Sequence, residues 1–422
     1  MIEIIIALFV LGYAAIAFEH PLKINKSGTA LLMGLLIWTV YKLGFPNADV
    51  AGELAHHLSG IAEILFFLMG AMTIVEVIDA HDGFNLITNR INTRSKIRLL
   101  WIITIISFLL SSILDNLTTT IVMVSLTRKL VKEPEQRLFF AGMIVIAANA
   151  GGAWSPIGDV TTTMLWIGGQ VSTLQIMKAL FLPSLIASLV PLIYVTIFEK
   201  KSLKGQLDSL DKKRLAPENK LIFFLGLGGL VFVPIFKQIT HLPPYVGMLL
   251  ALGIVWVASD LLHRKKDADD QKRYSASNAL MRIDMPSLLF FLGILLAVSG
   301  LESLHLLHQM ATWMDSAIGN KDVIIVGIGL LSAIIDNVPL VAATMGMYDL
   351  SDFPTDHKIW EFIAYCAGTG GSILIIGSAA GVAAMGMEKI DFIWYLKKMS
   401  FIALIGYVAG ALIYLLQFSL IH

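Results

Sequence analysis

The chain has 422 residues, of which 56% are hydrophobic and only 15% are charged, with a mean hydropathy of +0.77. Soluble domains are nearer half apolar and a quarter charged. The composition therefore excludes most soluble enzymes, disordered proteins and coiled coils, and indicates a polytopic membrane protein. Basic and acidic residues balance at 31 each, so charge does not point to nucleic acid. The single cysteine, Cys366, excludes a disulfide framework and any cysteine-built metal centre.

Apolar stretches long enough to cross a bilayer recur along the whole chain. The first, Met1–Phe18, carries Glu3 in place of a basic start and has no small-residue cleavage site, so we expect a membrane helix and not a signal peptide. A crossing needs about 20 mostly apolar residues. The predicted spans are Ile2–Phe18, Ser27–Leu43, Ile61–Asp79, Leu138–Trp166, Leu174–Phe198, Leu221–Phe236, Tyr245–Leu261, Met285–Leu301, Ile359–Met385 and Phe392–Leu416.

Two further apolar stretches, Leu99–Leu130 and Val323–Met345, are each interrupted by an Asp-Asn pair. Basic residues flank the first stretch on both sides and are scarce on both sides of the second. Because basic residues concentrate in cytoplasmic loops, we expect two re-entrant hairpins, the first from the cytoplasm and the second from outside. The same rule places both chain termini outside and the charged loop Glu199–Lys220 in the cytoplasm.

Three sequence blocks recur in the same order in the two halves of the chain. Chance explains one such match but not three at nearly constant spacing. The matched blocks are Leu65–Leu68 with Leu289–Leu292 (offset 224), Ser111–Asn116 with Ser332–Asn337 (offset 221), and Gly151, Gly152 and Gly158 with Gly370, Gly371 and Gly377 (offset 219).

Each half contains five spans and one hairpin, and since five is odd the second half should be inverted relative to the first. We expect repeats over residues 1–199 and 221–422, joined by a cytoplasmic linker over 200–220. Inverted repeats with broken helices are the usual plan of secondary transporters, in which the substrate site lies near the midplane. The predicted fold is therefore an all-α polytopic membrane protein with about ten transmembrane helices and two hairpins.

The predicted spans 138–166 and 359–385 should each be broken near the middle. Each is too long for one straight crossing, and glycines or proline crowd its centre, where they free backbone groups. Such a break must be buried in protein or line a wet cavity. For either break alone, a packing kink is the alternative. The residues at the breaks are Asn149, Gly151, Gly152, Ser155, Pro156 and Gly158 in the first, and Gly370, Gly371 and Gly377 in the second.

The Asp-Asn pairs carry the main functional hypothesis. An ionised carboxylate at the bilayer centre costs about 3 kcal/mol or more. With every Lys and Arg assigned to the end of a span, we expect Asp115 and Asp336 to have a proton or a bound cation as partner. Asn116 and Asn337 add carbonyl oxygens of the kind that a hard cation prefers. We therefore predict Na⁺ binding at these four residues; the alternative is that they only cap the returning helices.

Three further polar positions lie within the predicted spans. Asp159 follows the first break and precedes Thr161 and Thr162, whereas the matching position in the second half is Ser378, which caps without a charge. This asymmetry suggests that Asp159 adds to cation binding or proton transfer beyond capping a helix. Ser155 could supply a hydroxyl ligand. Glu76, near the cytoplasmic end of its span, is either a proton-entry group or an interfacial residue.

Several of these blocks resemble the NhaD-type sodium/proton antiporters of the ion transporter superfamily, which also contains citrate, dicarboxylate and arsenite carriers. The resemblance covers essentially the whole chain. It rests on Glu63–Gly70 through Asp82-Gly83-Phe84, on Ser112–Thr120, and on Asn149–Thr163. The family's polar positions carry over onto Glu76, Ser111, Asp115, Asn116, Asn149, Asp159, Thr161, Thr162, Asp336 and Asn337.

The resemblance implies a homodimer in which a transport domain moves against a scaffold in an elevator-like motion. It also implies export of Na⁺ or Li⁺ against uptake of H⁺ across a bacterial inner membrane, without enzymatic activity or a cofactor. The alternative is a carrier of arsenite or of a carboxylate such as citrate. Dicarboxylate relatives have a Ser-Asn-Thr tip where this chain has Asp115-Asn116-Leu117-Thr118, and the acid favours a cation. A channel is disfavoured because channels rarely need two matched broken helices with titratable tips. A membrane hydrolase is disfavoured because the spans contain neither a paired nucleophile and base nor a histidine-rich metal set.

Overall fold

The structure, a computed structural model, describes residues 1–17, 19–91, 93–199, 216–264 and 266–421. Within these residues the chain forms 22 helices and no β-strand, which confirms the all-α fold. Most of the predicted linker 200–220 lies outside the described residues. Many helices begin after Asn, Asp or Ser, whose side chain accepts a hydrogen bond from a free backbone N–H, as Asn25, Ser95 and Asp284 do.

The first half contains ten helices among the described residues. They are α1 (Ile2–Ala17), α2 (Glu19–Leu22), α3 (Lys26–Gly44), α4 (Val50–Ala80), α5 (Asn85–Thr88), α6 (Lys96–Leu114), α7 (Asn116–Leu130), α8 (Pro134–Ala153), α9 (Val160–Ile167) and α10 (Thr173–Phe198). The hairpin predicted over 99–130 corresponds to α6 and α7, which contact one another and meet at Asp115.

The second half contains the remaining twelve. They are α11 (Pro217–Thr240), α12 (Pro244–His263), α13 (Ala268–Tyr274), α14 (Ala276–Leu280), α15 (Met285–Ser303), α16 (Leu306–Ile318), α17 (Lys321–Leu331), α18 (Asn337–Met347), α19 (Lys358–Gly370), α20 (Ala379–Glu388), α21 (Phe392–Lys398) and α22 (Ser400–Ile421). The hairpin predicted over 323–345 corresponds to α17 and α18, with a turn before Asp336.

Eight of the described helices are long and apolar enough to cross a membrane: α3, α4, α6, α10, α11, α12, α15 and α22. The expected count of ten differs for structural reasons. The two broken spans are each divided into two pieces, and α1 has only 16 residues. In addition, α6 alone measures about 28 Å at 1.5 Å per residue, so it is itself long enough to cross. Whether the hairpins are re-entrant stays a prediction.

Both broken spans are interrupted at their paired glycines. Helix α8 ends at Ala153 and α9 begins at Val160, so the first break covers residues 154–159. Helix α19 ends at Gly370 and α20 begins at Ala379, so the second covers 371–378. A third interruption was not predicted: the span expected over Phe392–Leu416 is divided at Met399 into the short helix α21 and the long helix α22.

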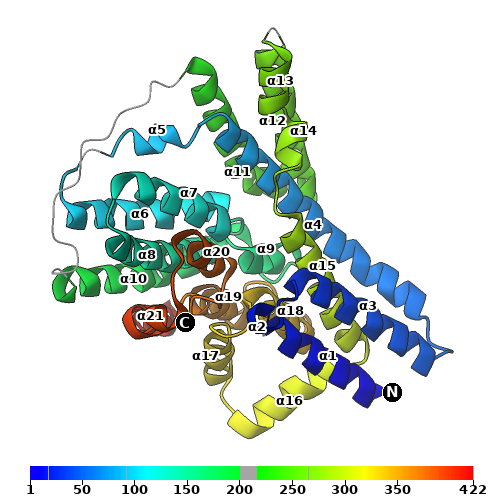
Figure 1. Ribbon diagram of the computed structural model, residues 1–422. Coiled ribbons are helices and arrows are strands. Elements are labelled where there is room, and N and C mark those ends of the chain that lie inside the picture. The colour runs from blue at the N-terminus through cyan, green and yellow to red at the C-terminus, as the bar shows by residue number, and fades with distance from the viewer. Residues whose placement is uncertain (18, 92, 200–215, 265, 422) are drawn as a thin grey trace.

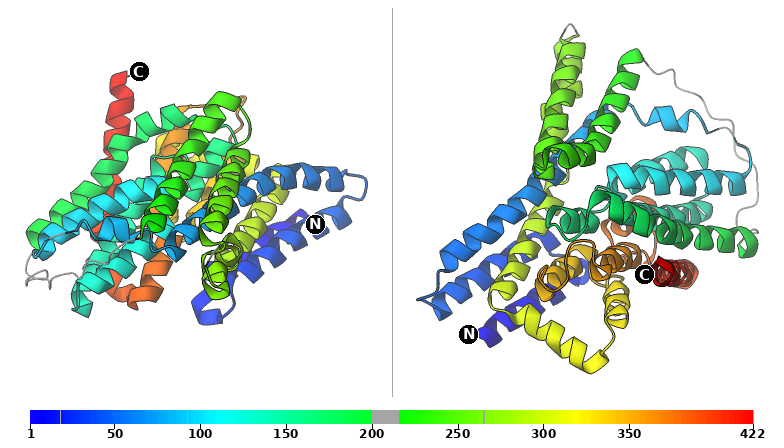
Figure 2. Two further views of the ribbon diagram at one scale, coloured as in Figure 1. Left: turned by 90° about the horizontal axis from the view of Figure 1, so that it is seen from above. Right: turned by 180° about the vertical axis from the view of Figure 1, so that it is seen from behind.

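The long helices fall into two groups (Figure 1, Figure 2). We call α1, α3, α4, α11, α12 and α15 the lateral group; in Figure 1 they run along the right side and across the top. We call α6 to α10, α17 to α20 and α22 the hairpin group. The main contacts between the groups join α15 to α18, α4 to α9 and α6 to α11. Helix α16 links the end of α15 to the start of α17 at the lower edge of Figure 1.

Equivalent helices of the two halves make equivalent contacts. Helix α3 packs against α15 as α12 packs against α4, and α1 packs against α3 as α11 packs against α12. In the hairpin group, α6 packs against α8 as α17 packs against α19, and α7 packs against α20 as α18 packs against α9. The last helices of the halves, α10 and α22, pack against each other. This pairing is what two structural repeats require; their inverted orientation stays a prediction.

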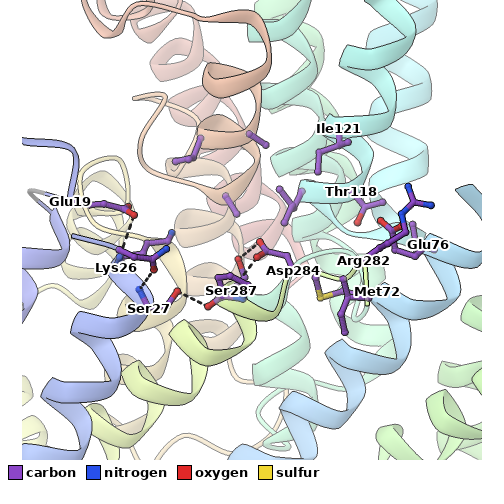
Figure 3. A pocket seen from close by; sticks show the side chains of 18 residues that line it. Glu19, Lys26, Ser27, Met72, Glu76, Thr118, Ile121, Arg282, Asp284 and Ser287 are labelled. Atoms are coloured by element: carbon purple, nitrogen blue, oxygen red, sulfur yellow. Dashed lines mark hydrogen bonds and ion pairs between the residues drawn. The ribbon is translucent and has the colours of Figure 1, made fainter. Parts of the chain in front are cut away.

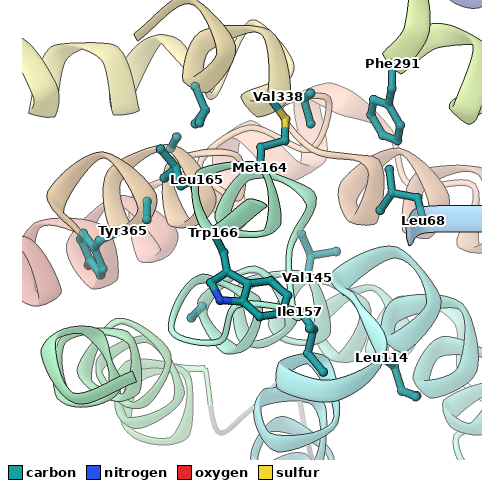
Figure 4. Packing of buried hydrophobic residues seen from close by; sticks show 14 of the residues in the cluster. Leu68, Leu114, Val145, Ile157, Met164, Leu165, Trp166, Phe291, Val338 and Tyr365 are labelled. Atoms are coloured by element: carbon teal, nitrogen blue, oxygen red, sulfur yellow. The ribbon is translucent and has the colours of Figure 1, made fainter. Parts of the chain in front are cut away.

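The core of the hairpin group surrounds the first broken helix (Figure 4). Trp166, at the end of α9, is fully buried, and its indole N–H donates to the Thr173 hydroxyl at 3.0 Å. Val145 of α8 and Ile157 of the break lie beside its ring in Figure 4. Every residue of α8 from Phe139 to Ala153 is buried. The broken helix is therefore enclosed in protein, which a break in the backbone within a membrane requires.

One buried acid ties three helix ends of the hairpin group together. The Glu388 carboxylate, at the end of α20, accepts from Arg128 Nε at 2.6 Å and from Arg137 Nε at 2.8 Å. Arg128 lies in the last turn of α7 and Arg137 in the first turn of α8. Only about 2% of the Glu388 side chain is exposed, so these charge-assisted bonds are largely shielded from water.

Candidate ion-binding site at the two hairpin tips

The first tip is a strained aspartate at the junction of α6 and α7. Asp115 has φ 112° and ψ 161°, a region that L-residues rarely adopt and that costs on the order of 1–3 kcal/mol. Its carboxylate caps α7: Oδ1 accepts from Thr118 N at 2.7 Å and Oδ2 accepts from the Thr118 hydroxyl at 2.8 Å. The predicted capping role is therefore present. Within the described residues, Asp115 forms no ion pair.

The adjacent residue starts a buried polar chain that connects both broken helices. Asn116 Nδ2 donates to Asp159 Oδ2 at 2.7 Å and to Asn149 Oδ1 at 3.0 Å. The Asn149 amide in turn donates to the Ser378 hydroxyl oxygen at 3.0 Å. Ser378 caps α20, so the chain runs from the first tip through both breaks. Asp159 and Ser378 occupy matched positions in the two halves. Their connection by hydrogen bonds through Asn116 and Asn149 was not predicted from the sequence.

Asp159 lies between the two tips. It is buried and caps α9, where Oδ1 accepts from Thr161 N at 2.9 Å and from the Thr161 hydroxyl at 2.8 Å. Its carboxylate interacts electrostatically with both Asp115 and Asp336. Asn337 also faces this carboxylate, although its amide nitrogen makes no hydrogen bond to any described residue.

The second tip corrects one premise of the sequence analysis, which left no basic partner for either tip acid. Asp336 pairs with Lys26: Lys26 Nζ lies 3.4 Å from Asp336 Oδ2. Asp336 Oδ1 accepts from Val338 N at 3.2 Å and so caps α18. The counting assigned Lys26 to the end of a span and overlooked that a lysine side chain extends well beyond its own backbone.

The serines that precede the tips make the same contact in both halves. The Ser111 hydroxyl donates to the Ala148 carbonyl at 2.6 Å, and the Ser332 hydroxyl donates to the Ala367 carbonyl at 2.8 Å. Each bond joins a hairpin to the broken helix of its own half. The hydroxyl hydrogen of Ser111 is therefore occupied by the bond to Ala148. The hydroxyl oxygen of Ser111 keeps lone pairs that can bind an ion.

The glycines at the breaks are required by close backbone approach. A side-chain carbon added to Gly158 would lie 2.6 Å from the Ser111 carbonyl oxygen, and one added to Gly377 would lie 2.6 Å from the Ser332 carbonyl oxygen. Carbons added to Gly151 or Gly370 would overlap backbone carbonyls of α6 and α17. Gly152 and Gly371 are restricted similarly by the breaks themselves. The matched glycines therefore let each hairpin lie directly against its broken helix.

The remaining predicted residues lie in the same region but differ in their bonding. The Thr162 hydroxyl donates to the Ala153 carbonyl at 3.2 Å, and the Ser155 hydroxyl oxygen accepts from Ile157 N at 3.4 Å. Among the residues that the structure describes, no three His, Cys, Asp or Glu side chains gather closely enough to hold one metal ion. A bound cation would therefore take most of its ligands from neutral oxygens, which hard cations accept.

A cavity of about 390 Å³ separates the two helix groups beside both tips (Figure 3). Its lining includes Lys26 near one end and Thr118, Glu76 and Arg282 together near the other end in Figure 3. Since Thr118 binds Asp115 and Lys26 binds Asp336, the cavity reaches a direct partner of each tip acid. A second cavity, of about 260 Å³, separates α4 and α15 from α9 and α18 and is lined by none of the predicted site residues.

Glu76 lines the larger cavity, of about 390 Å³, and among the described residues makes no hydrogen bond or ion pair with Asp115, Asn116, Asp159 or Asp336. Its Oε2 lies 3.5 Å from Arg282 Nε, and Asp79 Oδ2 lies 3.9 Å from Arg282 Nη2. The structure therefore separates Glu76 from the polar chain that joins Asn116, Asn149 and Asp159.

Comparison with known proteins identifies the family. A family described as "Citrate transporter" matches residues 13–353 of the chain, which is well over half of it. The chain belongs to this family. Membership places it among transporters and not among enzymes, and with the apolar helices it establishes an integral multi-pass membrane protein.

Similar proteins within this family are named sodium/proton antiporters. "Sodium/proton antiporter 2" of Arabidopsis thaliana is 50% identical over 97% of this chain and 98% of its own length, and "Sodium/proton antiporter 1" of the same plant is 55% identical over 97% and 71%. "Na(+)/H(+) antiporter NhaD" of Alkalimonas amylolytica is 31% identical over 99% and 91%. The resemblance to NhaD-type antiporters is thereby confirmed.

The fold resembles that of the YdaH transporter of Alcanivorax borkumensis, with a TM-score of 0.53 at 14% identity over 88% of this chain and 89% of the other. At this identity the likeness concerns the fold alone.

Proposed function

We propose that this protein exchanges Na⁺ for H⁺ across a membrane, using the acidic hairpin tips and the polar chain between them. The observation that carries the proposal is the environment of Asp159, a buried carboxylate that accepts from Asn116 and interacts electrostatically with both tip acids. Three acids in one low-dielectric region cannot all remain charged without a cation or a proton. Na⁺ and H⁺ therefore compete for the same oxygens, and each bound Na⁺ displaces protons.

The chemistry of the site favours a cation over a carboxylate. The family is described by citrate, whereas relatives that are 30–55% identical over nearly the whole chain are named for sodium and protons. An anionic substrate would be repelled by Asp115, Asp159 and Asp336, with Lys26 as the one ion-pair partner that the described residues offer these acids. Li⁺, a small hard cation, is proposed as a second substrate because the same oxygens suit it.

An elevator-like motion is the proposed mechanism of access. The two helix groups meet mainly through α15 with α18 and α4 with α9, so the hairpin group can slide as a body without breaking its own core. The larger cavity reaches partners of both tips, and the smaller cavity reaches no predicted site residue. On the predicted topology, in which Lys26 and Arg282 are cytoplasmic, this conformation faces inward.

The function is tested by ion exchange in inverted vesicles that hold a pH-sensitive dye. Addition of Na⁺ or Li⁺ should release protons from the vesicle interior, whereas addition of K⁺ at equal ionic strength, or of citrate, should not. Asp115→Asn and Asp336→Asn should each abolish the response at wild-type expression, and Asp260→Asn, at an exposed acid of α12, should leave it unchanged. A citrate response, or exchange at the wild-type rate in both tip variants, would rule out the proposed site.

The predicted topology is tested by labelling single cysteines from each side. Cys366 is buried, so the native cysteine should give little background. Exposed cysteines at Ser95 and Lys129 should label from the cytoplasm, and ones at Asn320 and Asp352 from outside. Labelling of the two members of either pair from opposite sides would refute that hairpin.

Two further proposals concern the membrane in which the protein resides and the number of its subunits. We propose a bacterial inner membrane and a homodimer, in line with the NhaD resemblance; the plant relatives at higher identity make an organelle membrane the alternative to test. Helices α11 and α12 have the largest lipid-accessible share of the long helices, which suits a subunit interface in the lateral group. Subunit counting by stepwise photobleaching in vesicles should give two per particle, and single-step bleaching would exclude the dimer.

A further inference from the structure

The two hairpin tips differ at one matched position, three residues after each aspartate. In the first half this residue is Thr118, which donates to both carboxylate oxygens of Asp115 through its N–H and its hydroxyl. In the second half it is Pro339, which has neither group. Asp336 consequently receives Val338 N on Oδ1, and no described hairpin residue donates to its Oδ2. Residues of the first hairpin therefore donate hydrogen bonds to both carboxylate oxygens of Asp115. Residues of the second hairpin donate to only one oxygen of Asp336.

Lys26 fills the open position from the other helix group. Its ammonium lies 3.4 Å from Asp336 Oδ2 and 4.5 Å from the centroid of the Phe290 ring. Lys26 begins α3 and Phe290 lies in α15, both in the lateral group, whereas Asp336 caps α18 in the hairpin group. The cation is therefore held against an aromatic face of one group while it contacts the acid of the other.

The ion pair is placed where a soluble cation can replace it. The Lys26 and Asp336 side chains keep 23% and 14% of their surface exposed, and Lys26 lines the 390 Å³ cavity. A single contact of 3.4 Å between partly hydrated groups is weak compared with a buried bidentate pair. Both the route and the modest strength suit displacement by an ion that arrives through the cavity.

We propose that Lys26 is a tethered cation that occupies Asp336 when neither Na⁺ nor H⁺ is bound there, and that binding of either ion releases it. The proposal rests on the proposed Na⁺/H⁺ exchange and names a positioning residue for it. While Lys26 is bound, the unloaded hairpin group is tied to the lateral group and does not reorient. Binding of Na⁺ or H⁺ breaks the Lys26–Asp336 ion pair, so the hairpin group reorients only when its site holds an ion. The transport of Na⁺ in one direction is therefore always coupled to that of H⁺ in the other.

The test is a Na⁺ titration of thermal stability in purified full-length protein at pH 8.5. Lys26→Gln removes the competing cation, so half-maximal stabilisation should need about two- to fivefold less Na⁺ than in the wild type. Lys26→Arg keeps the charge and should stay near the wild-type midpoint. Lys23→Gln, at an exposed residue of the same segment, is the matched control and should show no change. If Lys26→Gln does not fold, Lys26→Met, which keeps the aliphatic stem, replaces it.

The outcomes separate the tether from the exchange function. A purely structural ion pair predicts a lower melting temperature for Lys26→Gln with an unchanged Na⁺ midpoint, and an unchanged or raised midpoint overturns the proposal. If Na⁺ fails to stabilise even the wild type, the sodium site itself is wrong and the tether falls with it. A lowered midpoint in Lys26→Gln alone supports both.

Discussion

Asp159→Asn is the sharpest test of the buried polar chain. The change keeps the size of the side chain and replaces one carboxylate oxygen by an NH₂ group. If this group takes the Oδ1 position, it faces the N–H of Thr161, which cannot rotate away. If it takes the Oδ2 position, it faces the donating amide of Asn116 at what is now 2.7 Å. A flip of Asn116 would relieve that clash but would forfeit its bond to Asn149.

Every arrangement therefore leaves at least one buried donor or acceptor unpaired, which costs about 1–3 kcal/mol. With an unfolding entropy of roughly 2.1 cal/mol/K per residue, a chain of 422 residues loses about 1 °C of melting temperature per kcal/mol. We expect purified Asp159→Asn to melt about 1–3 °C below the wild type in matched detergent at saturating Na⁺, where a bound cation offsets the repulsion among the three acids. Asp260→Asn makes the same chemical change at an exposed position and should be neutral. Equal melting temperatures of the wild type and Asp159→Asn would refute the hydrogen bonds described for Asp159 and Asn116.

Two further predictions concern packing and pH. Gly151→Ala places a methyl group against the Phe108 carbonyl and should lower stability by about 1–3 kcal/mol, whereas Gly228→Ala, inside α11, meets no atom within 4 Å and should raise stability by about 0.5–1 kcal/mol; equal melting temperatures would contradict this. Burial lowers the pKa of His81, beside His263, to about 4. The unfolded chain therefore takes up the proton first, and stability should fall as pH falls from about 6.5 to 4, by at most about 1.4 kcal/mol per pH unit. His81→Phe should flatten that slope, and an unchanged slope would exclude His81 as its source.

Local rules were sufficient to find the tips and the breaks. Glycine and proline weaken a helix, and both interruptions lie next to the glycines that indicated them, although α10 continues through Pro183 and Pro191 without a break. The matched offsets paired Ser111 with Ser332 before any contact was known, and both make the same bond to a broken helix. These features depend on residues near one another in sequence or on a repeat that the sequence itself displays.

Contacts between distant segments could not be found in this way. The Lys26–Asp336 pair spans 310 residues and depends on how far one helix group is displaced along the other, which no local pattern records. The signal that could have pointed to it is Pro339, since a proline where the first half has Thr118 leaves the acid short of donors. The division of the last span at Met399 was missed because its apolar pattern is continuous apart from Lys397 and Lys398.

The carboxylate of Glu388 has a mechanical consequence. It joins the ends of α7 and α8, from the first half, to the end of α20, from the second half. A displacement of any one of these ends is opposed by the other two, because separating them would leave the buried Glu388 carboxylate without its guanidinium partners. The two halves of the hairpin group are therefore joined at this end by one buried acid, although they are far apart along the polypeptide.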